Sequence, residues 1–184
     1  ALIADGDAAA GAYKWAEAVQ QYEEAFEIAE DRALKEKLNE ARLRDYLQRG
    51  DRLLQAEKFE QARDVFEQAA EVAPQSKDAS SGIAEAQKRL AYLTLIQDGE
   101  AYRQASKYGK AIDAVRQAME VMQTPEARQR LENYEFEWYI AQARGFIAVG
   151  DFKAAEAALQ TARSIQKNPL LREVEKELAE AKEG

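Results

Sequence analysis

Apolar and small residues recur in the same order four times along the chain: an aromatic residue, Ala, a large apolar residue, Ala, then Ile or Val. Steps of three, four, three and three residues separate these positions, so all five lie on one face of a helix. The copies are Trp15, Ala18, Tyr22, Ala25 and Ile28; Phe59, Ala62, Phe66, Ala69 and Val72; Tyr108, Ala111, Val115, Ala118 and Val121; and Phe152, Ala155, Leu159, Ala162 and Ile165. The pattern predicts four helices, each with one buried stripe.

A second stripe precedes each copy and predicts another helix in each repeat. Its members are Leu2, Gly6 and Ala9; Tyr46, Gly50 and Leu53; Leu95, Gly99 and Tyr102; and Tyr139, Ala143 and Phe146. We expect short turns within the repeats at 11–14, 56–58, 106–108 and 150–151. Helix starts are expected at Asp31, Ser76, Thr124 and Asn168, because these residues cap helices well and Pro follows the last two.

These elements predict an all-α fold, an α-solenoid of about four antiparallel helix pairs with a C-terminal capping helix. The last helix carries Leu171, Val174 and Leu178 on one face and charged residues around the rest, as the end of an array requires. We expect one domain, 1–184, with repeats at about 1–31, 32–75, 76–124 and 125–167 and a cap at 168–184. The chain starts at Ala1 without Met, so we expect it to be a fragment of a longer protein.

The spacing of the repeats is uneven. The first Ala of each stripe lies at 18, 62, 111 and 155, at steps of 44, 49 and 44 residues. The intervening segments have no internal Pro and keep helical spacing, so lengthened first helices should hold most of these residues. The halves 1–92 and 93–184 superimpose in register. An ancestral duplication and a five-residue insertion near Pro74 both explain this arithmetic.

The second repeat resembles the tetratricopeptide repeat along its length. The residues that carry the resemblance are Gly50, Leu53, Phe59, Ala62, Phe66, Ala69 and Pro74. The other repeats have Glu30, Gln123 and Lys167 in place of the Pro, and all steps exceed the 34 residues of that family. The resemblance implies paired helices and a protein or peptide partner held on the face of the first helices.

Composition and net charge restrict the ligands and reactions that we expect of the chain. The net charge of -8 disfavours nucleic acid, which is bound by clustered Lys and Arg. Without His or Cys the chain lacks imidazole and thiolate groups, so we expect neither a zinc site nor a catalytic triad, and no cofactor. No apolar run is long enough to span a membrane.

Three rows on the first helices form the candidate partner-binding face. An apolar row holds Ile3, Leu47, Ile96 and Ile140; a charged row holds Asp7, Asp51, Glu100 and Arg144; and a mixed row holds Ala10, Leu54, Arg103 and Ile147. Offsets of zero, four and seven place the rows on one face. They would suit a basic or amphipathic helix or peptide. The alternative is that the apolar row is core and the carboxylates are solvated.

Four aromatic residues also crowd into 134–139: Tyr134, Phe136, Trp138 and Tyr139. Phe136 and Tyr139 follow the buried stripe, whereas Tyr134 and Trp138 point to another side. Packing between repeats would explain the cluster, but an exposed Trp138 would be a partner anchor. The candidate partner-binding residues are Leu47, Asp51, Leu54, Ile96, Glu100, Arg103, Trp138 and Arg144.

The expected function is a non-enzymatic scaffold or adaptor that binds a protein partner. The many carboxylates have no accompanying nucleophile, His or Gly-rich loop, which argues against catalysis. The alternative is a self-assembling structural protein, in which array ends or exposed rings join identical copies.

Overall fold

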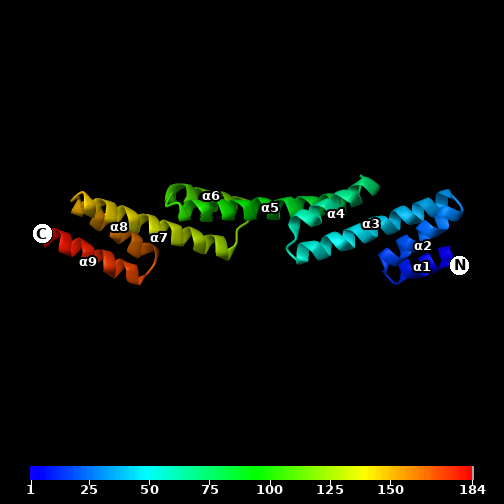
Figure 1. Ribbon diagram of the computed structural model, residues 1–184, viewed down its shortest axis with the longest axis horizontal. Coiled ribbons are helices and arrows are strands. Elements are labelled where there is room, and N and C mark those ends of the chain that lie inside the picture. The colour runs from blue at the N-terminus through cyan, green and yellow to red at the C-terminus, as the bar shows by residue number, and fades with distance from the viewer. Residues whose placement is uncertain (184) are drawn as a thin grey trace. The chain divides into compact units, whose positions relative to one another are not determined.

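A computed structural model describes residues 1–183, and it is all-α (Figure 1). Nine helices occur in these residues, no strand does, and helices that are neighbours in sequence pack together, as in an α-solenoid. The helices are α1 (Leu2–Gly11), α2 (Trp15–Ile28), α3 (Arg32–Gln55), α4 (Phe59–Val72), α5 (Lys77–Gln104), α6 (Tyr108–Val121), α7 (Pro125–Ala148), α8 (Phe152–Ile165) and α9 (Pro169–Glu183). The predicted fold class is confirmed.

Side-chain caps begin α3, α5, α7 and α9. Asp31 accepts a hydrogen bond from the backbone N–H of Leu34 at 3.0 Å, and Thr124 accepts one from that of Ala127 at 3.0 Å. Ser76 and Asn168 do the same before α5 and α9. These bonds satisfy N–H groups that have no partner within the helix, so the four predicted start signals act as caps.

The four turns within the repeats share one backbone conformation. Each holds a left-handed residue two positions after the helix ends: Tyr13, Glu57, Ser106 and Gly150, with φ between 55° and 77°. In every case the next residue donates its N–H to a carbonyl five positions back, as Lys58 does to Leu53 at 2.9 Å. This is the Schellman ending of a helix, which usually places Gly at the left-handed position.

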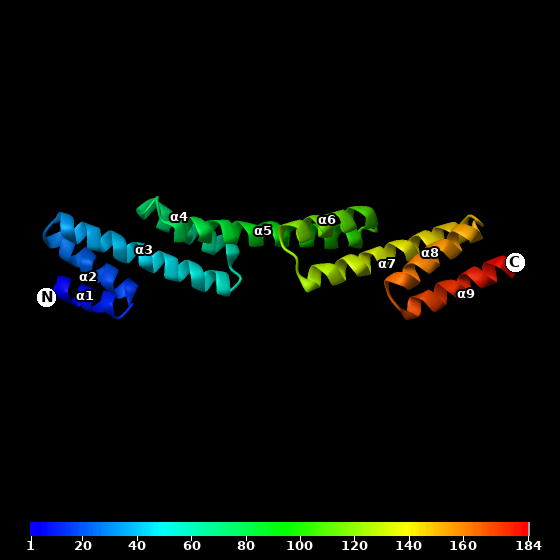
Figure 2. The same ribbon diagram turned by 180° about the vertical axis from the view of Figure 1, so that it is seen from behind.

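Two compact units divide the chain, 1–90 and 91–184, with the boundary inside α5. In the first unit the long helix α3 packs in two stages. Its first half contributes Leu34, Leu38 and Ala41 to a core with α2, and its second half packs Leu47 and Leu54 against α4. Figures 1 and 2 show α2 alongside the first half of α3. The prediction that 1–184 forms a single domain is not tested by this division.

The second unit repeats the two-stage arrangement in α7. The first half of α7 places Ala127 and Tyr134 in a core with α6. Its second half places Ile140 and Ala143 in a core with α8 and α9. The helices α3 and α7 have 24 residues each, whereas every second helix of a pair has 14. The predicted lengthening of the first helices is therefore confirmed, and it gives each long helix two packing partners.

Glycine allows close approach at the centre of the first unit. The ring of Phe66 is buried and lies against both Gly50 of α3 and Gly82 of α5. A Cβ at Gly50 would stand 2.6 Å from this ring, and one at Gly82 would stand 2.5 Å from it. Gly6 of α1 meets Tyr22 in the same way, at 2.5 Å. In the first unit, Gly6 and Gly50 of the second stripe thus receive an aromatic ring from the paired helix, whereas Gly99 in the second unit meets Val115.

Helix bounds recur at a distance of 93 residues. The bounds of α2, α3 and α4 return in α6, α7 and α8 without a shift, and the ends of α1 and α5 match in the same way. The longer middle step lies in α5, which has 28 residues, and in the four-residue linker before it around Pro74. Either a duplication or an insertion there produces this spacing.

One member of the predicted stripes is largely exposed, while the others are buried or half-buried. Ile28, the last residue of α2, is 77% exposed, whereas Ile165 at the same place in α8 packs against the core around Leu171. Its α2 neighbours Ala18, Tyr22 and Ala25 are buried as predicted. The difference arises because the core of α2 with α1 and α3 does not extend to the end of α2.

Candidate functional site

In the first unit, Asp7 of the charged row is bonded to two side chains of that unit. Its carboxylate accepts hydrogen bonds from the Tyr22 hydroxyl at 2.6 Å and from Lys37 Nζ at 2.6 Å. Lys37 lies on α3, so the interaction joins two successive first helices. The bonds to Lys37 and Tyr22 stabilise the carboxylate and lower the pKa of Asp7. Burial and the hydrogen bond to this carboxylate raise the pKa of Tyr22 to about 12.

Asp51 differs from the rest of the row because its side chain is exposed and has no hydrogen-bond or ion-pair partner among residues 1–183. Leu47 and Leu54, on the same face of α3, are half-buried and pack against the core around Ala62 and Phe66. Leu47 and Leu54 therefore act partly as core, while Asp51 is available to solvent.

In the second unit Glu100 is the centre of a polar cluster. Its carboxylate accepts hydrogen bonds from Arg103 Nη2 at 2.7 Å, from the Tyr134 hydroxyl at 2.7 Å and from Gln104 Nε2 at 3.1 Å. These three donors, Arg103 first, lower the pKa of Glu100 to about 2. Ile96, one turn earlier on α5, is half-buried and packs against the core around Val115.

Arg103 extends the cluster from α5 to α7. Its Nη1 lies 3.3 Å from a carboxylate oxygen of Glu137, and its guanidinium lies 5.9 Å from the centre of the Tyr134 ring. The hydrogen bonds to Glu100 raise the pKa of Arg103. Glu100 and Arg103 therefore hold α5 and α7 together within the second unit.

Arg144 has the same role between α7 and α9. Its guanidinium donates to Glu177 at 2.7 Å and to Glu173 at 2.8 Å. The interaction raises the pKa of Arg144 and lowers that of Glu177. Within each unit, the charged row joins successive first helices at Asp7, Glu100 and Arg144, and Asp51 is its unpaired member.

Trp138 lies on the surface of the second unit, with its side chain 37% exposed. Its ring centre is 5.5 Å from that of Tyr139 at a tilt of 34°. A shallow cleft of about 350 Å³ brings Trp138 together with Lys107 of the turn between α5 and α6 and with Lys110 in the first turn of α6. Tyr134 does pack, as the alternative for the aromatic cluster predicts: its ring is buried against α6, and its hydroxyl reaches Glu100.

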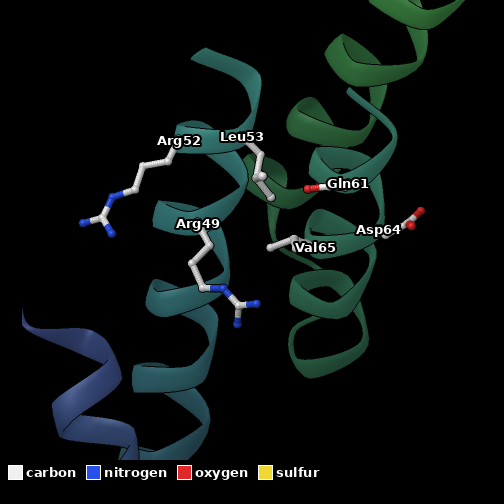
Figure 3. Close-up of a pocket in the computed structure, with 6 residues that line it drawn as sticks. All are labelled: Arg49, Arg52, Leu53, Gln61, Asp64 and Val65. Carbon is white, nitrogen blue, oxygen red and sulfur yellow. The ribbon is translucent and has the colours of Figure 1, made fainter. Parts of the chain in front are cut away.

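Sequence reasoning missed a hollow between α3 and α4, of about 490 Å³ (Figure 3). Its lining residues are Arg49, Arg52, Leu53, Gln61, Asp64 and Val65. The arginines lie on a different side of α3 from Leu47, Asp51 and Leu54. The sequence could have indicated this hollow, because Leu53 occupies the position where the later repeats have the larger Tyr102 and Phe146.

Residues 1–183 contain no group of three or more acidic side chains arranged to hold a metal ion. The helices over the same residues lack any stretch with the length and apolarity that a membrane span requires. Comparison of the chain with protein-family models, with curated proteins and with solved structures gave no match.

Proposed function

We propose that the chain is a non-enzymatic binding module of the tetratricopeptide-repeat type that holds a protein partner. The packing of Gly50 against Phe66 and of Gly6 against Tyr22 supports this resemblance, because the small and aromatic residues that carry it are in contact across the helix pair. The repeats here are longer than the family's. The lengthened helices do not weaken the proposal, since they still form antiparallel pairs.

The exposed ring of Trp138 is the observation that carries the binding role. Trp supplies a large contact area at low entropic cost and is common at the centres of protein interfaces. Its position beside a shallow cleft adds a recess into which a partner side chain can fit. Lys107 and Lys110 at the rim of that cleft offer charge for orienting the partner.

A second contact is proposed at Asp51 in the first unit. An exposed carboxylate with half-buried Leu47 and Leu54 beside it suits a basic or amphipathic segment. Ile96, Glu100, Arg103 and Arg144 contribute mainly by holding the first helices in place, because their side chains are already engaged within the second unit.

Photo-crosslinking at position 138 tests the proposal. Trp138 is replaced by a photoreactive phenylalanine analogue, and Gln117, an exposed residue of α6 in the same unit, is replaced in a control variant. Both are irradiated in extract of the native host. We expect one protein to be crosslinked at 138 but not at 117, and to bind the purified chain more weakly after Trp138→Ala. Equal crosslinking at both positions would contradict a partner surface at Trp138.

Self-assembly is the second candidate function. Tyr13, Ile28 and Val149 are each more than 70% exposed, so apolar groups are available for contact between identical copies. Light scattering over a range of concentrations separates the two functions. A monomer at every concentration removes self-assembly, whereas crosslinks from position 138 to a second copy of the chain would favour it.

A further inference from the structure

The hollow between α3 and α4 has an apolar floor and a basic rim. Leu53 of α3 and Val65 of α4 point toward one another in Figure 3, and Arg49 extends toward the gap between the two helices. Its volume of about 490 Å³ is within the range of pockets that take a ligand group. The hollow is open to solvent on the surface of the first unit.

Arg52 lines the hollow from α3, and its guanidinium extends away from α4 into solvent in Figure 3. Its guanidinium has no hydrogen-bond or ion-pair partner among residues 1–183. Arg49 has only a 3.4 Å contact with Asp45 and lies 5.7 Å from the ring centre of Tyr46. The acidic residue of the lining, Asp64, is paired with Arg63 at 2.7 Å and points away from α3 (Figure 3). The lining is therefore net positive in a chain whose net charge is -8.

The other repeats do not share this chemistry. At the position of Leu53, Tyr102 and Phe146 place rings that pack against their own cores. Lys110 also lies over Tyr102, with its Nζ 5.7 Å from the ring centre. The positions that match Arg49 and Arg52 hold Asp98 and Ala101 in one repeat, and Gln142 and Gly145 in another. The smaller Leu and the two arginines thus occur together only in the second repeat.

We propose that this hollow binds an acidic amphipathic helix of another protein. Burial of one large apolar side chain on Leu53 and Val65 would supply affinity. Arg49 and Arg52 are three residues apart on α3, about 4.5 Å along the axis. Carboxylates one turn apart on the partner helix have a similar separation along the axis. One can pair with Arg49, and the other with Arg52 once that unpaired side chain turns toward the hollow. Trp138 and Asp51 are not among the residues that line the hollow. The inference rests on the proposed role as a protein-binding module.

The test uses a defined peptide probe. A fluorescein-labelled helix of about 18 residues, roughly five turns, carries a Leu stripe flanked by Glu residues three apart. The control peptide has Lys in place of every Glu. Fluorescence anisotropy with the full chain should show binding of the acidic peptide, weaker binding of the basic one, and an affinity that falls as salt is added.

Variants locate the binding. Arg52→Glu should weaken the acidic peptide roughly tenfold, because it places like charge at the rim. Leu53→Phe introduces the residue that the matching position 146 already accommodates, and should weaken binding by filling the hollow. Gly145→Glu is the control, since it places the same carboxylate at the position equivalent to Arg52, where nothing lies within 4 Å. It changes the net charge by one unit, whereas Arg52→Glu changes it by two. Circular dichroism checks that each variant is folded, and Arg49→Glu replaces Leu53→Phe if that variant is not.

Two results would overturn the proposal: an acidic peptide that binds no better than the basic one, or an affinity that Arg52→Glu changes no more than Gly145→Glu does. Crosslinking at 138 is measured separately. If a partner is crosslinked at 138 but Arg52→Glu does not weaken the peptide, only the present inference is contradicted. If Arg52→Glu weakens the peptide but no partner is crosslinked at 138, only the Trp138 surface is contradicted.

Discussion

Gly50 and Phe66 are in such close contact that no side-chain carbon fits between them, because an added Cβ would stand 2.6 Å from the ring. The ring cannot move away, since it is buried and Gly82 meets it as well. Gly50→Ala should therefore destabilise the protein by about 1–3 kcal/mol through overpacking, despite the better helix propensity of Ala. Urea unfolding measures the change.

A matched control is available in α7. Gly145 has nothing within 4 Å of an added Cβ, so Gly145→Ala should stabilise the protein by about 0.5–1 kcal/mol. If the two substitutions had equal effects, the close contact at Gly50 would not limit stability.

The Glu100 cluster predicts a dependence of stability on acid pH. The pKa of Glu100 is about 2 in the folded chain and 4.5 in a model peptide, so its carboxylate stabilises the fold above about pH 4.5. This contribution is lost as the pH falls from about 4.5 to about 2. We expect Glu100→Gln to be less stable than the parent at neutral pH, with a difference that shrinks across this range. Asp51→Asn, in the same row but unpaired, should follow the parent at every pH.

Tyr22 predicts a corresponding dependence on alkaline pH. Its pKa is raised from 10.0 to about 12, so the unfolded chain releases the phenol proton first. Stability from this group is complete below about pH 10 and is lost as the pH rises toward 12. The stability advantage of the parent over Tyr22→Phe should shrink over that interval. Urea midpoints that stay parallel for the two proteins would show that Asp7 and Tyr22 are not bonded as described.

The left-handed turn residues predict a stabilising change at Glu57, which is not among the residues that line the hollow. Glu57 has φ of 57°, a conformation that costs a residue with a side chain roughly 1–2 kcal/mol. Glu57→Gly removes this cost but increases the freedom of the unfolded chain, so we expect a net gain of about 0.5 kcal/mol. Gly150→Ala should have the opposite sign. The melting temperatures of both variants measure these changes in stability. A lower melting temperature for Glu57→Gly than for the parent would contradict the predicted gain.

The helices and their caps could be predicted because their signals are local. The spacing of Ala62, Phe66 and Ala69 defines a buried face without any knowledge of the partner helix. Thr124 followed by Pro125 identifies a helix start for a similar reason. The Schellman turns could not be recognised from their left-handed residues, because three of the four lack the Gly that usually marks this conformation.

The candidate site was harder to predict because its side chains meet across helices. Glu100 and Tyr134 are 34 residues apart, and neither periodicity nor composition shows that their side chains converge. The position of Asp51 in a row with Asp7 and Glu100 was clear, yet only the structure separates the unpaired carboxylate from the paired ones. The prediction that these rows bind a partner remains a prediction.

Because the helix bounds recur after 93 residues, one half of the chain can be aligned with the other position by position. Each position between 15 and 72 has a counterpart in the same helical register, so tolerance to substitution can be assessed by comparing the protein with itself. The turn residue already appears as Tyr, Glu, Ser and Gly, which indicates weak constraint, whereas the Ala at 18, 62, 111 and 155 never varies. A library that exchanges residues only between matching positions would sample changes that this backbone has already accommodated once.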